Sequence, residues 1–440
     1  FNNTGQWGDG QQWPPNPPAS SPIEAHIAAY VGSDHAVMAN GEAANEYTLS
    51  GVQRFSRWFT VVRGEYLVLH DRVAVDPTRR NASIQWYLHS FTRFNVSNLS
   101  PLGQTWLNTT NGRSTANIAI LRPSPSTALA PTNGNFYDIP EWNKAANYYN
   151  MNFLLLPFGY AYNHQTASAV QQMEYLSVFQ PVANDSEALC ATGGVLAEEV
   201  WSGTVVGTRV SCPSSNYTDV LLYAREAPLG SNPPPATGAR DNVCGPEAAC
   251  ASVCSPAAYA VDTARRCTWN EYAFVGDALV ISEPASSSLS SPRVTALDFS
   301  VAKGVLVQAP ASELAFRCSG PCNAGLRNFQ DGATLLVSAS ADVQVTLASH
   351  ALCTVSVTDA ESRVVTSPTV PNAFSVPYQQ YVLALPTGSG PQYVRFVGCT
   401  MAPLPPSSSS SSGGASGPED SATSTTVYIA AGAGGGFLLL

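Results

Sequence analysis

The sequence predicts an all-β protein assembled from antiparallel sheets. Its 440 residues include 33 glycines and 33 prolines, and only 12% of its residues are charged, a composition typical of many short strands joined by turns. Runs of β-branched and aromatic residues recur between turn-forming residues along most of the chain. The best helix candidate, residues 23–30, is short, so we expect few helices. A chain of this length has room for two or three domains, each with its own core.

Strand patterns are densest in the first half of the chain. Asn40-Gly41 predicts a hairpin between residues 35–39 and 42–48, because both residues tolerate positive φ. Arg63-Gly64 predicts a second hairpin between residues 54–62 and 65–75. We expect these strands to form an antiparallel β-sandwich over residues 1–230, with further strands at residues 83–94, 117–121, 151–156, 173–181, 203–210 and 218–224.

A change of composition predicts further regions. Residues 231–270 read as a Pro-rich linker followed by a cysteine-rich insertion, and residues 271–400 as a smaller, disulfide-containing β region. Residues 401–426, rich in Ser, Gly and Pro, bury too little apolar area to fold and predict a disordered stalk. Residues 427–440 are apolar but shorter than the ~20 residues that span a bilayer. They fit either a transmembrane helix cut short or the tail of a glycolipid-anchor signal.

Cysteines and glycosylation sequons both indicate an extracellular or cell-surface protein. Ten cysteines lie between Cys190 and Cys399, and an even number fits disulfides in an oxidising compartment. The chain starts at Phe1 without a leader pattern, so we expect a fragment of a longer, C-terminally anchored protein. Sequons for N-glycosylation start at Asn2, Asn81, Asn95, Asn98, Asn108, Asn184 and Asn216.

Two groups of cysteines have spacings that suggest pairing. Cys318-Ser-Gly-Pro-Cys322 predicts a disulfide that closes a tight loop through a turn at Gly320-Pro321, with a catalytic thiol as the minor alternative. The cluster from Cys244 to Cys267 favours disulfides over zinc in an exported protein, and spacing leaves its pairing open. The histidines lack metal-ligand spacing. We therefore expect no metal and no cofactor in this chain. The formal net charge of −10 argues against nucleic acid as a partner.

One segment carries a recognisable pattern. Residues 41–73, GEAANEYTLSGVQRFSRWFTVVRGEYLVLHDRV, are followed by QWYLHS at residues 85–90. The pattern runs through Glu42, Tyr47, Arg57 and Asp71 to Leu88-His89, and it resembles the C-terminal β-domain of the heparinase II/III-like family. That family includes polysaccharide lyases and dermatan-sulfate epimerases. The resemblance implies a β-sandwich of that type, packed against an α-helical toroid.

The resemblance also implies where the chemistry takes place. Members of the family remove the C5 proton of a uronate, which requires neutralisation of the carboxylate. Their catalytic groups and zinc ligands lie on the toroid and on a His-x-His loop that this sequence lacks. No catalytic residue can therefore be carried over to this chain, and we expect it to be inactive alone. Its expected partners are an acidic polysaccharide, the toroid of the same protein and, through its tail, a membrane. The alternative is a non-catalytic glycan-binding or adhesion module.

Several residues of the pattern are candidates for contact with a glycan or for a structural role. If Arg63-Gly64 is a two-residue turn, Arg57 lies opposite His70. A run of seven arginines within residues 54–93 would either attract a polyanion or form a salt-bridged surface, and we favour the salt-bridged surface. Asp71, in an apolar strand, is expected to be structural, either in an ion pair or as a hydrogen-bonded sheet residue, because a buried carboxylate must be paired. The candidates for substrate contact are Arg57, His70, Arg72 and His89, and the structural candidates are Asp71, Tyr47, Cys318 and Cys322.

Overall fold

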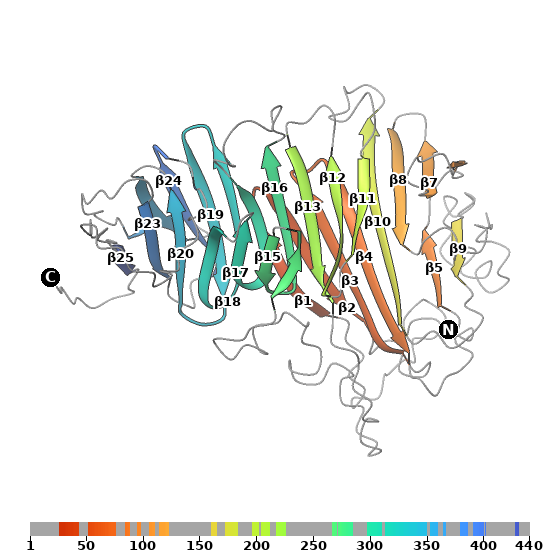
Figure 1. The fold of residues 1–440 in the computed structure, drawn as a ribbon, viewed down its shortest axis with the longest axis horizontal. Helices are drawn as coiled ribbons and strands as arrows, with labels where there is room; N and C mark the ends of the chain where they lie inside the picture. Colours follow the sequence, from red (N-terminus) through yellow and green to blue (C-terminus); the bar gives the residue numbers. More distant parts are fainter. Residues whose placement is uncertain are drawn as a thin grey trace, which may run out of the picture.

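The fold is all-β, as the sequence predicts (Figure 1). The computed structural model describes residues 26–43, 52–75, 84–88, 95–97, 105–110, 114–122, 160–164, 172–183, 196–201, 204–211, 217–225, 266–270, 272–284, 297–309, 313–349, 353–359, 364–366, 379–385, 390–399, 401 and 427–430. Within these ranges every regular element is a strand, and no helix occurs.

The first sheet is formed by strands from the N-terminal half of the chain, in the order β1-β2-β3-β4-β10-β8-β7-β6. All of its ladders are antiparallel. A separate two-stranded ladder joins β5 (Ile84–Leu88) to β9 (Tyr160–His164). The strands of the first sheet are β1 (His26–Gly32), β2 (Ala36–Glu42), β3 (Val52–Val62), β4 (Tyr66–Val75), β6 (Asn95–Ser97), β7 (Thr105–Thr110), β8 (Ser114–Arg122) and β10 (Gln172–Ala183).

A second, much longer sheet contains the remaining strands. Its main path runs β11-β12-β13-β16-β17-β18-β19-β24-β21-β22, and β14, β15, β20, β23 and β25 branch from it. Among the described ladders only β23 with β25 is parallel. The strands of the long sheet are β11 (Leu196–Trp201), β12 (Val205–Ser211), β13 (Tyr217–Ala224), β14 (Cys267–Trp269), β15 (Tyr272–Val275), β16 (Ala278–Pro284), β17 (Asp298–Ala309), β18 (Glu313–Phe329), β19 (Gly332–Ala339), β20 (Val343–Ser349), β21 (Thr354–Thr358), β22 (Val364–Thr366), β23 (Gln379–Leu385), β24 (Gln392–Val397) and β25 (Val427–Ala430).

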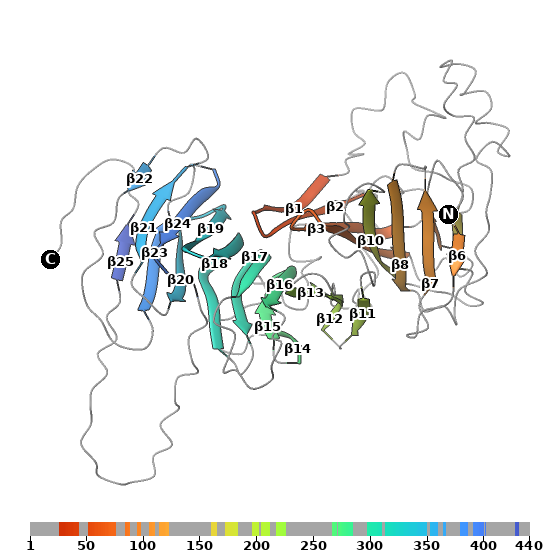
Figure 2. The same ribbon diagram turned by 90° about the horizontal axis from the view of Figure 1, so that it is seen from above.

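The first sheet packs face to face on the β11–β17 end of the long sheet, which forms an antiparallel β-sandwich (Figure 2). Because side chains alternate between the two faces of a strand, every second residue enters the space between the layers. Met38, Trp58 and Leu176 come from the first sheet, and Leu221 and Tyr223 come from the long sheet. These side chains are buried and form one apolar core.

The opposite face of the long sheet helps to build a second core. Two long strands make this possible, because each changes its neighbours along its length. β17 pairs with β16 through residues 298–302 and with β15 through residues 306–308, while β18 pairs with β20 before it pairs with β19. Register shifts interrupt the β17–β18 ladder where the exchange occurs, as expected at β-bulges that bend strands. The sheet therefore folds over itself around side chains such as Phe274, Phe299 and Phe316.

The structure corrects the predicted hairpin at Asn40-Gly41. Both residues lie inside β2, where they pair with Trp58 and Arg57 of β3. On the other side they pair with Ala29 and Ile27 of β1 across a register shift. Two flanking strands thus satisfy the backbone of β2, and this long-range pairing overrides the local turn preference. The chain instead reverses between β1 and β2, where Ser33 N donates to Ala36 O at 3.1 Å.

Two other expectations also differ from the structure. The candidate helix at residues 23–30 is wrong over its described part, because residues 26–32 form β1 at the sheet edge. The tight turn expected at Gly320-Pro321 is not a reversal of the chain. Residues 318–321 lie within β18, between the pairs Leu306↔Arg317 and Gly304↔Cys322, so they form a bulge in a continuous strand.

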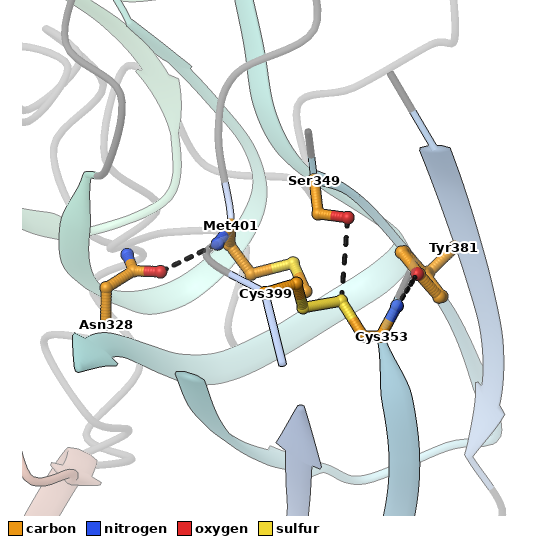
Figure 3. Close-up of a disulfide and its surroundings, with 6 residues drawn as sticks. All are labelled: Asn328, Ser349, Cys353, Tyr381, Cys399 and Met401. Carbon is orange, nitrogen blue, oxygen red and sulfur yellow. Dashed lines mark hydrogen bonds between the residues drawn. A yellow bond between two sulfur atoms is a disulfide. The ribbon is translucent and has the colours of Figure 1, made fainter. Parts of the chain in front are cut away.

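A disulfide between Cys353 and Cys399 links the start of β21 to the chain after β24 (Figure 3). The two Cα atoms are 5.3 Å apart and the cysteines are separated by 46 positions in sequence. Cys353 N donates to the hydroxyl of Tyr381 at 2.8 Å, which attaches the cystine to β23 in the opposite layer. Met401 N donates to Asn328 Oδ1 at 2.7 Å and holds the chain that leaves Cys399. The predicted disulfide-containing β region is confirmed, although spacing did not predict this pairing.

The predicted boundary at residues 231–270 stays a prediction. Among the described residues, β13 lies before this segment and β16 after it, and the two strands pair over seven residue pairs. Cys267, at the end of the cysteine cluster, is disulfide-bonded. Of the predicted stalk at residues 401–426, residues 402–426 lie outside the described residues, and Met401 forms a β-bridge with Ser349. Strand β25 lies within the predicted tail.

Removal of the Cys353–Cys399 disulfide should lower the free energy of unfolding. In the chain-entropy model, a crosslink that closes a loop of this length lowers the entropy of the unfolded chain and stabilises the folded state by about 4 kcal/mol. The double variant Cys353→Ala/Cys399→Ala should therefore unfold at clearly lower denaturant concentration, as followed by tryptophan fluorescence. Cys318→Ala, which removes a buried unbridged thiol, is the matched control. A double variant no less stable than this control would contradict the assigned role of the disulfide.

Candidate functional site

The β3–β4 hairpin carries most of the sequence-predicted site residues, and its register differs by one position from the expected one. Arg63 and Gly64 have φ of 48° and 74°, and Glu65 N donates to Val62 O at 2.9 Å. Pairing resumes only at Val62↔Tyr66, so Glu65 is an additional loop residue. A shift of one residue moves side chains to the other face of a sheet.

Because of this register, Arg57 lies opposite Asp71 and not opposite His70. Arg57 Nε and Nη2 donate to Asp71 Oδ1 and Oδ2 at 2.5 and 2.7 Å, a bidentate ion pair. The Asp71 side chain is 1% exposed and that of Arg57 is 34% exposed. The expected structural ion pair at Asp71 is thereby confirmed, and the Arg57–His70 cross-strand pair is wrong.

Glu42, the first acidic residue of the pattern, joins the same group of strands. Its Oε1 accepts a hydrogen bond from Phe55 N at 3.2 Å, and Ala43 N donates to Phe55 O at 2.8 Å. The Glu42 side chain is buried at the end of β2. Glu42, Arg57 and Asp71 thus connect β2, β3 and β4 through side-chain hydrogen bonds.

His70 and Arg72 point in the opposite direction, into the space between the two layers. His70 is fully buried, and its ring lies 4.7 Å from that of Tyr223. Burial, and then the nearby charges of Arg72 and Arg122, hold the pKa of His70 well below its ordinary value, so the ring is neutral. Among the described residues, neither ring nitrogen has a hydrogen-bond partner. Substrate binding by His70 stays a prediction, which its burial disfavours.

Arg72 belongs to a cluster of arginines around one carboxylate. Its Nη2 donates to Ala224 O at 2.5 Å, and its Nε lies 3.7 Å from Glu174 Oε1. Arg122 and Arg225 lie 3.6 and 3.9 Å from the Glu174 carboxylate. Burial lowers the pKa of the Arg72 guanidinium, which Glu174 opposes. The sequence offered no signal for this cluster, because its members come from four strands or strand ends far apart in the chain.

A second polar network, missed by sequence reasoning, joins the two layers at the other end of the sandwich. Asp219 of β13 accepts hydrogen bonds from Arg63 Nη1 and Nη2 at 2.8 and 2.6 Å. It also accepts from Tyr66 Oη at 2.7 Å and from Ser282 Oγ at 2.5 Å. The ring of His35 lies 2.7 Å from Ser282 Oγ through Nε2 and 3.0 Å from Ser300 Oγ through Nδ1. Burial is the main reason that the pKa of His35 falls to about 3.

The group of Ser282, His35 and Asp219 contains the residue types of a hydrolase triad, but its proton arrangement is different. The Ser282 hydroxyl donates its hydrogen bond to Asp219, so in the contact between Ser282 and His35 the Nε2–H of His35 is the donor. A general base would instead accept that proton. All three side chains are buried, so we assign them a structural role between the layers.

The salt bridges expected for the run of arginines are present at three of its described members. Arg57, Arg63 and Arg72 contact carboxylates, and Arg54 is buried. Its pKa falls to about 10, mainly through burial. Arg79, Arg80 and Arg93 lie outside the described residues.

The remaining predicted residues are only partly described. His89, Tyr47, Asn2, Asn81, Asn98, Asn184 and Asn216 lie outside the described residues. Asn95 and Asn108 are register partners on β6 and β7, and their glycosylation stays a prediction. Within the described ranges, no group of three or more His, Cys, Asp or Glu side chains is close enough to hold a metal ion. In the same ranges, no helix has the length and hydropathy needed to cross a membrane.

Cys318 and Cys322 are buried and unbridged. A hydrogen bond between the thiols lowers the pKa of Cys318, and the same contact raises the pKa of Cys322. Cys322 Sγ also lies 3.4 Å from Gly304 O across the bulge. The predicted bridge between these two cysteines is therefore not formed in this structure.

The Arg57–Asp71 pair should respond asymmetrically to substitution. Arg57→Met leaves a buried carboxylate without its cation and should cost about 3 kcal/mol of unfolding free energy. Asp71→Asn should cost about 1 kcal/mol, because the partly exposed guanidinium can be rehydrated and the amide oxygen still accepts. Denaturant titrations measure both, with Arg395→Met at an exposed position of β24 as control. If Arg57→Met and Asp71→Asn lowered the unfolding free energy equally, the buried Asp71 carboxylate would not depend on Arg57 for its stabilisation.

The burial of His35 predicts a pH dependence of stability. Its folded-state pKa of about 3 lies below the ordinary 6.5, so the unfolded chain binds a proton that the folded chain excludes. The contribution of neutral His35 to the free energy of unfolding is therefore fully present above pH 6.5. It is lost progressively as the pH falls toward 3. His35→Gln should reduce the slope of unfolding free energy against pH by about 1.4 kcal/mol per pH unit.

Urea titrations at several pH values below neutrality measure that slope. His26→Gln, at an exposed position of β1, serves as the matched control for the loss of a histidine side chain. A slope of the His35 variant equal to that of the wild type would show that His35 titrates normally and would refute its assigned burial.

Comparisons with known proteins give limited results. No family model matches the chain, and no curated protein matches it. Among solved structures, heparan sulfate lyase HepC from Pedobacter heparinus is similar with a TM-score of 0.29 and 10% sequence identity. A mutant of the same lyase gives a TM-score of 0.28 and 8% identity. In each case the similarity covers 48% of this chain and 29% of the lyase chain.

Proposed function

We propose that this chain is the β-sheet part of an extracellular protein that acts on uronate-containing polysaccharides. In this proposal the protein is a lyase or an epimerase, and an α-helical toroid from the same polypeptide supplies the catalytic groups. The β-sheet part holds and shapes the glycan cleft, and it needs no cofactor of its own. The polypeptide is attached to the cell surface through its C-terminal tail.

One observation carries this proposal. Three of the residues on which the resemblance to the heparinase II/III-like family depends, Glu42, Arg57 and Asp71, connect three neighbouring strands through side-chain hydrogen bonds. Glu42 binds Phe55 N, and Arg57 forms a bidentate ion pair with Asp71. A sequence pattern that builds one connected structural unit favours a shared β-domain over a chance match, because its members depend on one another in the fold.

Two histidines of the described region, His35 and His70, favour a supporting role for this part. His35 and His70 are buried, and burial lowers the pKa of each. Neutral, enclosed imidazoles suit structural contacts better than proton transfer to a large polymeric substrate, which needs an accessible group. The chemistry is accordingly assigned to the toroid.

The second candidate is a non-catalytic cell-surface module that binds glycans. Ion pairs neutralise Arg63 and Arg72 between the layers. They favour this candidate because they leave the described part of the β-domain as a stable scaffold without an obvious reactive group. The two candidates share the ligand class and differ in the presence of catalysis.

Activity of the complete polypeptide tests the proposal. The full-length protein should release unsaturated uronate ends from heparan sulfate, dermatan sulfate or alginate, detected by their ultraviolet absorbance, or exchange the C5 proton for deuterium in heavy water. The 440-residue chain alone should do neither. Binding of these polymers by the full-length protein without elimination or exchange would reject the enzyme and favour the module. Activity of the isolated chain would overturn the assignment of chemistry to the toroid.

A further inference from the structure

The outer face of the first sheet carries exposed aromatic side chains near its β1 edge. Tyr30, Ala39 and Phe59 are register partners on β1, β2 and β3, so they form one row across the sheet. Tyr30 is 58% exposed and Phe59 is 43% exposed. Their neighbour Trp58, on the inner face, is almost completely buried. A small residue between two exposed aromatic ones leaves a shallow surface with a ring at each side.

The ring of Tyr30 lies along the strand and does not stand away from it. A Cβ atom at position 32 would lie 2.6 Å from Tyr30 Oη and 3.0 Å from Cε1 and Cζ. The ring therefore occupies the space that a side chain at position 32 would need, and only glycine permits this arrangement. A ring laid over the backbone exposes one face to solvent, which is the geometry that a flat ligand requires for stacking.

Phe59 lies beside a cation of the neighbouring row, Arg57. The guanidinium of Arg57 sits 5.9 Å from the centre of the Phe59 ring. Its partner carboxylate, Asp71, is 1% exposed, whereas Arg57 is 34% exposed. The buried member of the ion pair is thus the anion, and the part that faces solvent is the cation. This surface is complementary to an anionic ligand.

We propose that Tyr30 and Phe59 form a stacking platform for a 1,4-linked uronate polysaccharide, with Arg57 placed to receive a carboxylate from the sugar on Phe59. Strands two positions apart in a sheet are separated by roughly 9.5 Å, close to the length of one disaccharide unit of such a polymer. Alternate sugar rings would then lie on the two aromatic side chains. Arg57 would give the platform its preference for acidic over neutral chains.

This inference rests on the proposed function, because it identifies where the β-domain contacts the polysaccharide. The stacking platform can be wrong while the proposed function is right, since a lyase or epimerase could hold its substrate through the toroid alone. The test therefore measures binding by the 440-residue chain and not catalysis.

Binding of heparan sulfate and alginate oligosaccharides is measured by isothermal titration calorimetry. Tyr30→Ala and Phe59→Ala should each weaken binding roughly tenfold, as expected for an aromatic anchor. Gly32→Ala keeps the tyrosine but displaces its ring, and it should weaken binding severalfold. Phe329→Ala is the matched control, because Phe329 is 45% exposed and Arg327 lies 5.3 Å from its ring centre. Carboxyl-reduced oligosaccharides should bind more weakly than the acidic ones.

Thermal unfolding of each variant separates loss of binding from loss of fold. Binding that is weakened in the Tyr30, Phe59 and Gly32 variants and unchanged in the Phe329 variant, at unchanged unfolding temperature, would support the proposal. Equal affinity of the wild type and the Tyr30 and Gly32 variants would overturn it, as would an absence of binding by the wild type. A change of oligomeric state without a change of glycan affinity would assign the face to a second copy and would also overturn it.

Discussion

The carboxylate of Asp219 is the point on which the arrangement of the two layers depends. It lies at the interface between the first sheet and the long sheet, and it accepts hydrogen bonds from Arg63, Tyr66 and Ser282. Two of these donors come from the β3–β4 hairpin of the first sheet, and one comes from the long sheet. Because a buried carboxylate is costly unless it is fully satisfied, each donor must be in place. The apolar core would tolerate small shifts of one sheet over the other, whereas this network accepts only one register.

The polar network also explains why an apolar core can be flanked by so many charges. At one end of the sandwich Asp219 gathers the donors, and at the other end Glu174 lies among Arg72, Arg122 and Arg225. Between these ends lie large apolar side chains such as Trp58 and Leu176. Hydrogen bonds to ionised groups are directional, so the two ends define the alignment of the layers while the centre contributes most of the buried area. On the outer face of the first sheet, the side chains of Tyr30 and Phe59 near the β1 edge remain exposed.

The sequence was informative wherever strand identity depended on local pattern. The strands of the β3–β4 hairpin and the ion pair of Asp71 follow from the alternation of apolar residues and from the need to pair a buried carboxylate. The register of the β3–β4 pairing was harder to predict from sequence. One extra loop residue, Glu65, decides whether Arg57 pairs with His70 or with Asp71. Asn40-Gly41 misled because pairing with β1 and β3 outweighed its turn preference. The His35 network was beyond prediction, since its members meet only after strands more than 200 positions apart have packed.

The β11–β17 end of the long sheet covers the first sheet, and this affects the order in which the chain can fold during synthesis. The first sheet is complete at β10, but the residues that cover its inner face belong to β12, β13, β16 and β17. Until those later strands leave the ribosome, side chains such as Met38 and Trp58 have no opposite layer. Long-range strand pairing of this kind is slow and leaves apolar surface open to aggregation. During synthesis the first sheet is therefore complete before the strands that cover its inner face, and at that stage the nascent chain would depend most on chaperones.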